Sequence, residues 1–370
     1  MRQERVDGID LARAIAIFGM FVMHTFFHQD RDNWFYQLFQ GRSTILFTVL
    51  AGVSVVLMSR TRTAGQSLVQ FVVRGLLLIL LGLTITTEHT GPIVILTTYG
   101  ALYLVLAPLL FRVPGWAQAL LAAVGVFVCP WLSHVWRESP DPGGVPTWPL
   151  LIDYPSRSLE LLFLTGAFPL LTLVPVFVAG MATGNALVKW RTAWDGLIGI
   201  GGVLAAAGFW LSSLYLSRSD FIERQAARGT HLEEFTSMLD SAPGVTPLGD
   251  AGWLWVYVPH SGSIAELLGS IGTSLLVIGL CVLLCLFRPF NLVMYPLRAV
   301  GRMPLTVYTA HILFLGWLAS QGMNIAWVKW AWVNLLVPLA FAPVWLLFFK
   351  RGPLESVQRQ ILRLLERPHP

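Results

Sequence analysis

Charged residues are scarce in this chain. Of its 370 residues, 12% are charged and 55% are hydrophobic, whereas soluble domains carry about 25% charged residues. The mean hydropathy is +0.66. These values exclude an ordinary soluble domain and predict an all-α integral membrane protein. The net charge of +5 does not indicate nucleic-acid binding, because basic residues in a membrane protein mainly set its orientation.

Cysteine and lysine are also rare. The cysteines Cys129, Cys281 and Cys285 all fall in apolar segments, so the sequence predicts no disulfide framework. Cys281 and Cys285 are one helical turn apart in "LLVIGLCVLLCLF", which is typical of two small buried side chains rather than of a metal site. Arg greatly outnumbers Lys, and Ala, Gly and Leu are abundant, as in proteins from GC-rich bacterial genomes. We therefore expect the cytoplasmic (inner) membrane of a bacterium.

Long apolar runs are the main feature of the sequence. A crossing needs about 20 mostly apolar residues, and ten runs approach or exceed that length. They are 9–28, 43–58, 68–87, 91–111, 116–136, 160–187, 194–216, 263–287, 301–320 and 326–349. The first run contains charge and is followed by no small-residue cleavage site, so we interpret it as a retained helix. The small-residue segment "GLIGIGGVLAAAG" in the seventh run predicts close helix packing.

The distribution of basic residues predicts the topology. The short connections "SRTRTAGQ", "VKWRT" and "RPFNLVMYPLR" fall on one side of a ten-helix arrangement, and the positive-inside rule makes that side cytoplasmic. Both termini are then cytoplasmic, and 1–370 forms a single transmembrane domain. We expect the loops 137–160 and 217–262 to be extracytoplasmic. They would act as lids or substrate platforms, or form a solvated cap with no role in the reaction. The segment 350–370 is a basic amphipathic tail on the cytoplasmic face.

The first run carries a stripe of ionisable residues. The segment "GIDLARAIAIFGMFVMHTFFHQ" contains Asp10, Arg13, His24 and His28. At about 100° per residue, all four lie within roughly 60° of one another on a helix. Ionisable groups in lipid cost several kcal/mol each, so the stripe should face the bundle interior. The helical rise places Asp10 and Arg13 at the cytoplasmic mouth and His24 about 21 Å beyond Asp10, in the outer half of the membrane.

Each residue of the stripe also has a structural interpretation. Asp10 and Arg13 have the i,i+3 spacing of an ion pair at a helix start, which is compatible with a functional role. His28 suits an ordinary interfacial position. His24 suits either a buried histidine bonded to a carbonyl or a general base, since neutral histidine is the natural base near pH 7.

Further polar residues can converge on the same path. Arg74 lies early in the third run, and Glu88 ends that run on the outer side. Arg302 opens the ninth run, and Tyr308 and His311 share one side of it near mid-membrane. Arg74 and Arg302 equally suit side chains that reach out to lipid phosphate.

Four motifs resemble a known group of membrane acyltransferases. "GIDLARAIAIFGMFVMH" is similar to the first helix of the heparan-α-glucosaminide N-acetyltransferase family, of YeiB-like bacterial membrane proteins and, more remotely, of the acyltransferase-3 family. "GRSTILFTVLAGVSVVL" (41–57) looks like the segment that follows. "AVGRMPLTVYTAHILF" (299–314) and "KRGPLESVQRQ" (350–360) resemble the YeiB-type late helix and C-terminal G-P-L-E element. The motifs cover about a fifth of the chain in the expected order. The lysosomal members place their proposed catalytic histidine in the loop after this helix. In the present chain, the candidates in that region are His24 and His28.

The resemblance implies transfer of an acyl group, in the first instance acetyl, from cytoplasmic acyl-CoA to a hydroxyl or amine at the outer side. The acceptor would be a glycan, a lipid-linked molecule or a small molecule, and the enzyme would sit in the bilayer, with a homodimer as a further expectation. His24 would be the base, with His311 and Asp10 also catalytic; His311, Tyr308 or Arg42 would hold the oxyanion or acceptor, and His28 and Glu88 would also contact the acceptor. The residues expected to bind the phosphates of the donor are Arg13, Arg60, Arg62, Arg74 and Arg302.

Two other classes remain open from the residues alone. A transporter or permease for a small polar or lipid-linked substrate would also need an intramembrane polar stripe, although no inverted repeat is visible. A metal site built on His24 and His28 would have suitable i,i+4 spacing, but no third ligand is identifiable, so we expect no metal.

Overall fold

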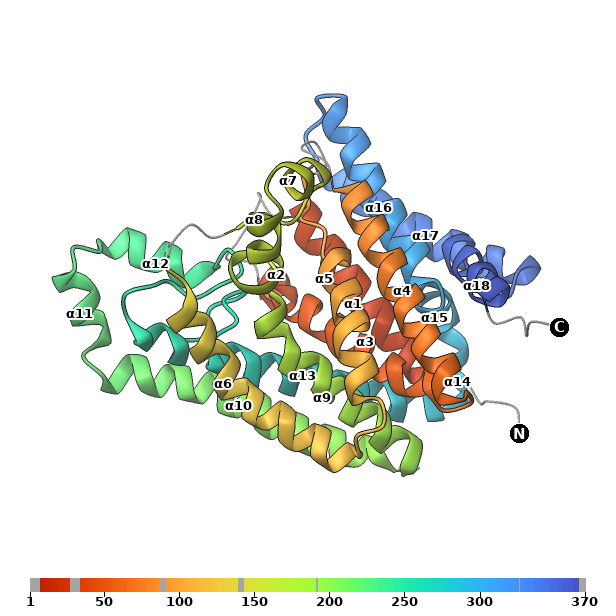
Figure 1. The fold of residues 1–370 in the computed structure, drawn as a ribbon, viewed down its shortest axis with the longest axis horizontal. Coiled ribbons are helices and arrows are strands. Elements are labelled where there is room, and N and C mark those ends of the chain that lie inside the picture. The colour runs from red at the N-terminus through yellow and green to blue at the C-terminus, as the bar shows by residue number, and fades with distance from the viewer. Residues whose placement is uncertain are drawn as a thin grey trace.

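The chain folds into a bundle of helices in a computed structural model (Figure 1). The structure describes residues 7–26, 34–86, 91–138, 143–190, 192–325 and 327–365, and every regular element within these ranges is helical. This confirms the all-α membrane class predicted from composition. The physical reason is that a helix satisfies its own backbone hydrogen bonds, which lipid cannot do.

Ten helices coincide with the ten apolar runs. They are α1 (Asp7–Phe26), α3 (Arg42–Ser59), α4 (Ala64–Ile85), α5 (Leu96–Leu110), α6 (Gly115–Trp136), α9 (Leu170–Lys189), α10 (Ala193–Arg218), α13 (Ile264–Leu286), α16 (Pro304–Ser320) and α17 (Val328–Phe348). Shorter helices fill the connections: α2 (Trp34–Phe39), α7 (Trp148–Asp153), α8 (Pro155–Glu160), α11 (Phe221–Ala227), α12 (Leu232–Asp240), α14 (Arg288–Val293), α15 (Tyr295–Gly301) and α18 (Pro353–Leu365), with a π turn at Leu161–Thr165 and a 3-10 turn at Ala251–Trp255.

The length of these helices limits how many can be counted as spans. Within the described residues, eight helices are long and apolar enough to cross a membrane, and α15 with α16 makes a ninth if the bent pair is one span. α5 has 15 residues, which is short of the roughly 20 that a perpendicular crossing needs. The protein is therefore a multi-pass membrane protein, and the count of ten crossings stays a prediction.

Prolines explain where the helices depart from the predicted runs. α15 and α16 meet at an angle of 83°, and Pro304 begins α16. Proline lacks an N–H donor and clashes with the preceding turn, so it starts a helix readily but interrupts one that continues through it. Pro169 likewise precedes α9, so the run predicted at 160–187 is divided between α8, the π turn and α9.

α1 lies in the centre of the bundle and packs against α3, α13, α15 and α17 (Figure 1). Glycines permit the closest helix contacts. A Cβ at Gly301 of α15 would overlap the backbone of Asp10, and a Cβ at Gly208 of α10 would overlap the backbone of α13 at Gly269. The close packing predicted from the small-residue segment of the seventh run is thus confirmed, with α13 as the partner.

The bundle has two ends, which we call the tail end, where α18 docks, and the cap end, which holds the two long connections. At the tail end, Asp7 at the start of α1 is hydrogen-bonded by Asn291 and paired with Arg298. α18 docks at the same end, where Glu355 accepts hydrogen bonds from the backbone N–H groups of Leu305 and Thr306 at the start of α16. The G-P-L-E element therefore anchors the tail to the first turn of α16. The start of the first described helix, α1, and the last described helix, α18, therefore lie at the same end of the bundle.

The cap end holds the two long connections. In Figure 1, α11 and α12 lie at the left of the view and α7 and α8 in its upper middle, away from α14, α15 and α18 at the right. The charged segment 219–240 forms two helices rather than one, because Gly229 has a φ of +87° and separates α11 from α12. Phe221, Phe235 and Trp253 form a separate small core beneath them.

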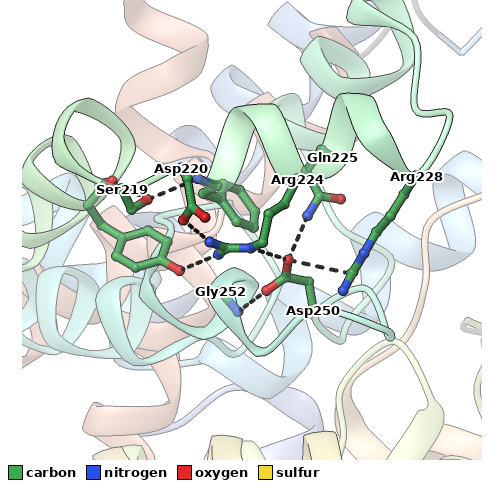
Figure 2. A network of polar contacts seen from close by, with 9 residues as sticks. Ser219, Asp220, Arg224, Gln225, Arg228, Asp250 and Gly252 are labelled. Carbon is green, nitrogen blue, oxygen red and sulfur yellow. Dashed lines mark hydrogen bonds and ion pairs between the residues drawn. The ribbon is translucent and has the colours of Figure 1, made fainter.

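A charge network closes this small core (Figure 2). The buried Asp250 carboxylate accepts hydrogen bonds from Arg224, Gln225 and the backbone N–H of Gly252, and Arg228 lies 3.4 Å from it. Burial alone raises the pKa of Asp250, but the bonds from Gly252 and Arg224 outweigh it and hold the pKa below its ordinary value. The network gives the connection 217–262 a defined shape.

Candidate active site

Among the described members of the polar stripe, Asp10 is buried, and Arg13 and His24 contact side chains of neighbouring helices inside the bundle, as predicted. Asp10 is only 2% exposed and forms an ion pair of 3.0 Å with Arg13. Arg13 also donates a hydrogen bond of 2.9 Å to the hydroxyl oxygen of Ser54 on α3. The i,i+3 ion pair expected from the spacing is therefore present, and Arg13 additionally joins α1 to its neighbour.

A chain of hydrogen bonds runs through the histidines at the other end of α1. His24 Nδ1 lies 2.9 Å from His311 Nε2, and His311 Nδ1 lies 2.8 Å from Asn334 Oδ1. The Asn334 amide nitrogen donates to the carbonyl oxygen of Trp330, which leaves its oxygen for His311. The Phe21 ring stacks on His311 with centroids 3.9 Å apart and holds the imidazole in place. Three helices, α1, α16 and α17, thus contribute one polar side chain each.

The chemistry of these groups assigns the protons. An amide oxygen only accepts, so His311 must carry its proton on Nδ1. The Nε2 atom of neutral His311 is then an acceptor, and His24 must donate to it from Nδ1. His24 Nε2 is left with a free lone pair. A histidine whose second nitrogen is fixed in this way is oriented as a general base.

His24 borders a cavity at the cap end of the bundle. Its volume is about 590 Å³, and its walls come from α1, α3, the segment at 91–93 and both long connections. The apolar part includes Met20, Phe39 and Phe168, and the connection 217–262 contributes Ser241–Gly244 and His260. We call this the cap cavity. Both long connections therefore shape the space beside the candidate base.

A smaller cavity of about 50 Å³ lies deeper along α1, between Arg13, Arg74 and Tyr308. We call this the inner cavity. The Arg74 guanidinium lies 5.0 Å from the centre of the Tyr103 ring and 3.5 Å from the Gln358 amide oxygen of α18. On α16, Tyr308 of the inner cavity is three residues from His311, so about one helical turn separates the two polar regions.

The remaining predicted residues lie elsewhere. Tyr308 accepts a long hydrogen bond from the Ile95 backbone N–H and lines the inner cavity rather than the cap cavity. Arg42 donates to the Gln37 and Leu38 carbonyl oxygens and lies over the Phe209 and Tyr257 rings, outside the residues that line the cap cavity. Arg60 and Arg62 follow α3, and Arg302 lies between α15 and α16; these three do not line either cavity. His28 and Glu88 lie outside the described residues.

Sequence reasoning missed three polar residues near the site. Asn334 is the one amide in the run 326–349, and Glu266 is the one charged residue in the run 263–287, so intramembrane polarity was an available signal. His260 had no such signal, because it lies in a connection. Burial lowers the pKa of His260 to about 4, which keeps its imidazole neutral at physiological pH.

Possible metal ligands were compared within the described part of the chain. No group of three or more His, Cys, Asp or Glu side chains is close enough there to hold an ion. Cys281 and Cys285 are both buried and unbonded to other cysteines, as expected for small core residues.

Comparison with known families covers most of the chain. Residues 236–364 match a family described as a protein of unknown function (DUF418), which corresponds to the YeiB-like proteins. Residues 5–217 match the family described as heparan-alpha-glucosaminide N-acetyltransferase, catalytic. No match was found among curated proteins. Because the second match spans more than half of the 370 residues and agrees with the ordered sequence motifs, the chain belongs to the heparan-α-glucosaminide N-acetyltransferase-like family of membrane acyltransferases.

Proposed function

We propose that this protein transfers an acyl group, acetyl in the simplest case, from acyl-CoA to a hydroxyl or amine acceptor. The observation that carries the proposal is the directed chain from Asn334 through His311 to His24, which ends on a free nitrogen beside a cavity of about 590 Å³. Such a nitrogen can remove the proton of an acceptor bound in that cavity. Membership of an N-acetyltransferase-like family supports the same reaction class.

The reaction needs one base that later acts as an acid. His24 Nε2 takes the proton from the acceptor as its oxygen or nitrogen attacks the thioester carbonyl carbon. The imidazolium of His24 is stabilised through His311, whose Nε2 accepts the Nδ1 proton of His24. When the carbon–sulfur bond breaks, His24 returns the proton to the departing thiolate. The products are the acylated acceptor and free CoA.

The donor would enter from the tail end. Its phosphates need cationic partners, and arginine suits phosphate because its guanidinium can form two parallel hydrogen bonds. Arg13 and Arg74 line the inner cavity, and Arg60, Arg62 and Arg302 stay candidates at the same end. Arg13 is eleven residues before His24, which is about 16 Å along α1. A phosphopantetheine arm is long enough to span that distance and bring a thioester to His24.

The acceptor would occupy the cap cavity. In the proposed orientation both termini are cytoplasmic, the connections 137–160 and 217–262 face the outer side, and the membrane is the inner membrane of a bacterium. The acceptor is then a glycan, a lipid-linked molecule or a small molecule reached from outside or from the bilayer. Association of two copies into a homodimer belongs to the same proposal.

The experiment combines donor binding with product release. Protein in lipid nanodiscs is titrated with acetyl-CoA by calorimetry, and CoA release is followed with a thiol reagent, using glucosamine as an amine acceptor and diacylglycerol as a hydroxyl acceptor. We expect His24→Ala to bind acetyl-CoA but to lose CoA release, and Arg13→Ala to bind more weakly. Leu336→Ala is the control, because this α17 side chain is 56% exposed on the bundle surface. Absence of acetyl-CoA binding by the wild type at millimolar concentration would refute the proposal and favour a transport path.

A further inference from the structure

His260 is the one residue other than glycine with a positive φ among those that the structure describes, at +63°. This left-handed conformation is unfavourable for a residue with a Cβ, and histidine adopts it much less readily than glycine. Backbone strain of this kind persists where the surroundings hold it and is concentrated at functional sites.

The first turn of α13 holds the strained loop. The Glu266 carboxylate accepts a hydrogen bond of 2.7 Å from the backbone N–H of His260 and another of 2.7 Å from that of Gly262. The Ser263 hydroxyl accepts from the Glu266 backbone N–H and donates to the carbonyl oxygen of Val256. Glu266 is 2% exposed. The buried Glu266 carboxylate therefore holds the backbone of His260 and Gly262 in place, and this fixes where the His260 side chain leaves the loop.

His260 belongs to the wall of the cap cavity. His260 and His24 both line the cavity, and the two imidazoles are close enough to interact electrostatically. Within the described parts of the chain, no group forms a hydrogen bond with the His260 imidazole. Its N–H donor and its lone pair are therefore available to a molecule bound in the cavity.

The residues assigned to the reaction so far provide no hydrogen-bond donor for the carbonyl oxygen of the acyl group. His24 is committed as the base. Both ring nitrogens of His311 are already bonded, to Asn334 and His24. Tyr308 lines the inner cavity and Arg42 lies outside the cap cavity. None of the three residues predicted for this role is therefore in place. Neutral histidine can act as such a donor when its imidazole stays uncharged, as the imidazole of triosephosphate isomerase does.

We propose that His260 is a second catalytic histidine, whose imidazole N–H donates to the thioester carbonyl oxygen while His24 activates the acceptor. The inference rests on the proposed acyl transfer. As the acceptor attacks the carbonyl carbon, the carbonyl π electrons move onto the oxygen, and the His260 N–H stabilises that oxyanion. The oxyanion then collapses, the carbon–sulfur bond breaks, and the thiolate leaves with the proton held by His24. His260 itself gains and loses no proton.

Two substitutions separate the imidazole from the strained backbone. His260→Gly removes the imidazole but accepts a positive φ without penalty, so the variant should fold and melt no lower than the wild type. His260→Asn keeps an N–H donor, and asparagine tolerates this backbone region better than most residues. Leu232→Ala is the matched control, because Leu232 lies in the same long connection but is 74% exposed and lines neither cavity.

The assay is CoA release from acetyl-CoA with glucosamine or diacylglycerol, with the dissociation constant of acetyl-CoA measured alongside. We expect His260→Gly to lower kcat by about 10²- to 10³-fold, the usual loss for one oxyanion donor, with the dissociation constant unchanged. His260→Asn should recover part of that loss, and Leu232→Ala should match the wild type.

The outcomes distinguish the two proposals. A wild-type kcat in His260→Gly would overturn the role of His260 and leave the acyl transfer standing. An unchanged kcat with a raised KM for the acceptor would also overturn it, since His260 would then only bind the acceptor. A wild type that releases no CoA would overturn the acyl transfer and, with it, the role of His260.

Discussion

Replacing Asn334 with alanine tests the direction of the hydrogen-bond chain. Asn334 Oδ1 accepts the Nδ1 proton of His311 at 2.8 Å, and His311 Nε2 in turn faces His24 at 2.9 Å. Without the amide, a neutral His311 can move its proton to Nε2 and donate to His24 Nδ1 instead. His24 would then carry its proton on Nε2, and the nitrogen facing the cap cavity would no longer be a base.

The size of the effect follows from one buried hydrogen bond. Asn334 is 5% exposed and His311 is 3% exposed, so water replaces the lost amide poorly. Leaving a buried polar group without its partner costs about 1–3 kcal/mol. If the whole cost falls on the productive tautomer, kcat/KM decreases by about 5- to 150-fold. The affinity for acetyl-CoA should not change, because Asn334 lines neither cavity.

Two measurements check this expectation. CoA release from acetyl-CoA gives kcat and KM, and the ¹⁵N chemical shifts of labelled histidine report which ring nitrogen carries the proton. Leu336→Ala, on the exposed side of the same helix, controls for truncation of an α17 side chain. Wild-type kcat in folded Asn334→Ala would refute the reasoning. So would a loss of activity fully explained by unfolding at the assay temperature, with unchanged histidine shifts in the folded fraction.

Three further predictions concern the scaffold. Glu355→Ala removes the acceptor for two backbone N–H groups at the start of α16, so it should cost about 1–2 kcal/mol and expose α18 to protease in a limited-digestion assay. Gly180→Ala places a Cβ against the backbone of α3 and should cost about 1–3 kcal/mol by overpacking, whereas Gly199→Ala, with nothing near its Cβ position, should raise the melting temperature or leave it unchanged. Asp250 has a lowered pKa in the folded protein, so its stabilising contribution is present above the ordinary Asp pKa of about 3.9 and is lost as the pH falls through the lower folded value. The protection factors of residues 219–258 in hydrogen exchange should therefore fall at acid pH in the wild type, and in Asp250→Asn they should already be low at pH 7. Equal protection factors in the two proteins at pH 7 would contradict this role.

The fold class follows from the sequence because its cause is local. An apolar run of about 20 residues has few stable alternatives to a helix in lipid, so each of the ten runs contains one. The same local reasoning predicted that Asp10 faces the bundle interior, because a carboxylate exposed to lipid is energetically costly. Prolines changed the ends: Pro304 separated α15 from α16 and Pro169 delayed the start of α9.

The sequence predicted only some of the residues of the candidate site. His24 stood out because it lies on the ionisable stripe of α1, and His311 because it lies near mid-membrane in an apolar run. Their contact, across 287 positions of the chain, depends on how α1 packs against α16. Asn334 carried a recognisable signal as a lone amide in an apolar run, but nothing local indicated that it faces His311.

By itself, the sequence determined that this is a helical membrane protein, which face of its first helix is polar, and which family it resembles. These properties depend on the hydropathy and spacing of neighbouring residues. Only the tertiary structure decided that Asn334, His311 and His24 form one chain, that Arg42 and Tyr308 lie outside the cap cavity, and that a strained loop turns His260 into it. These arrangements depend on helix crossing and on the shape of long connections, which short-range patterns do not encode.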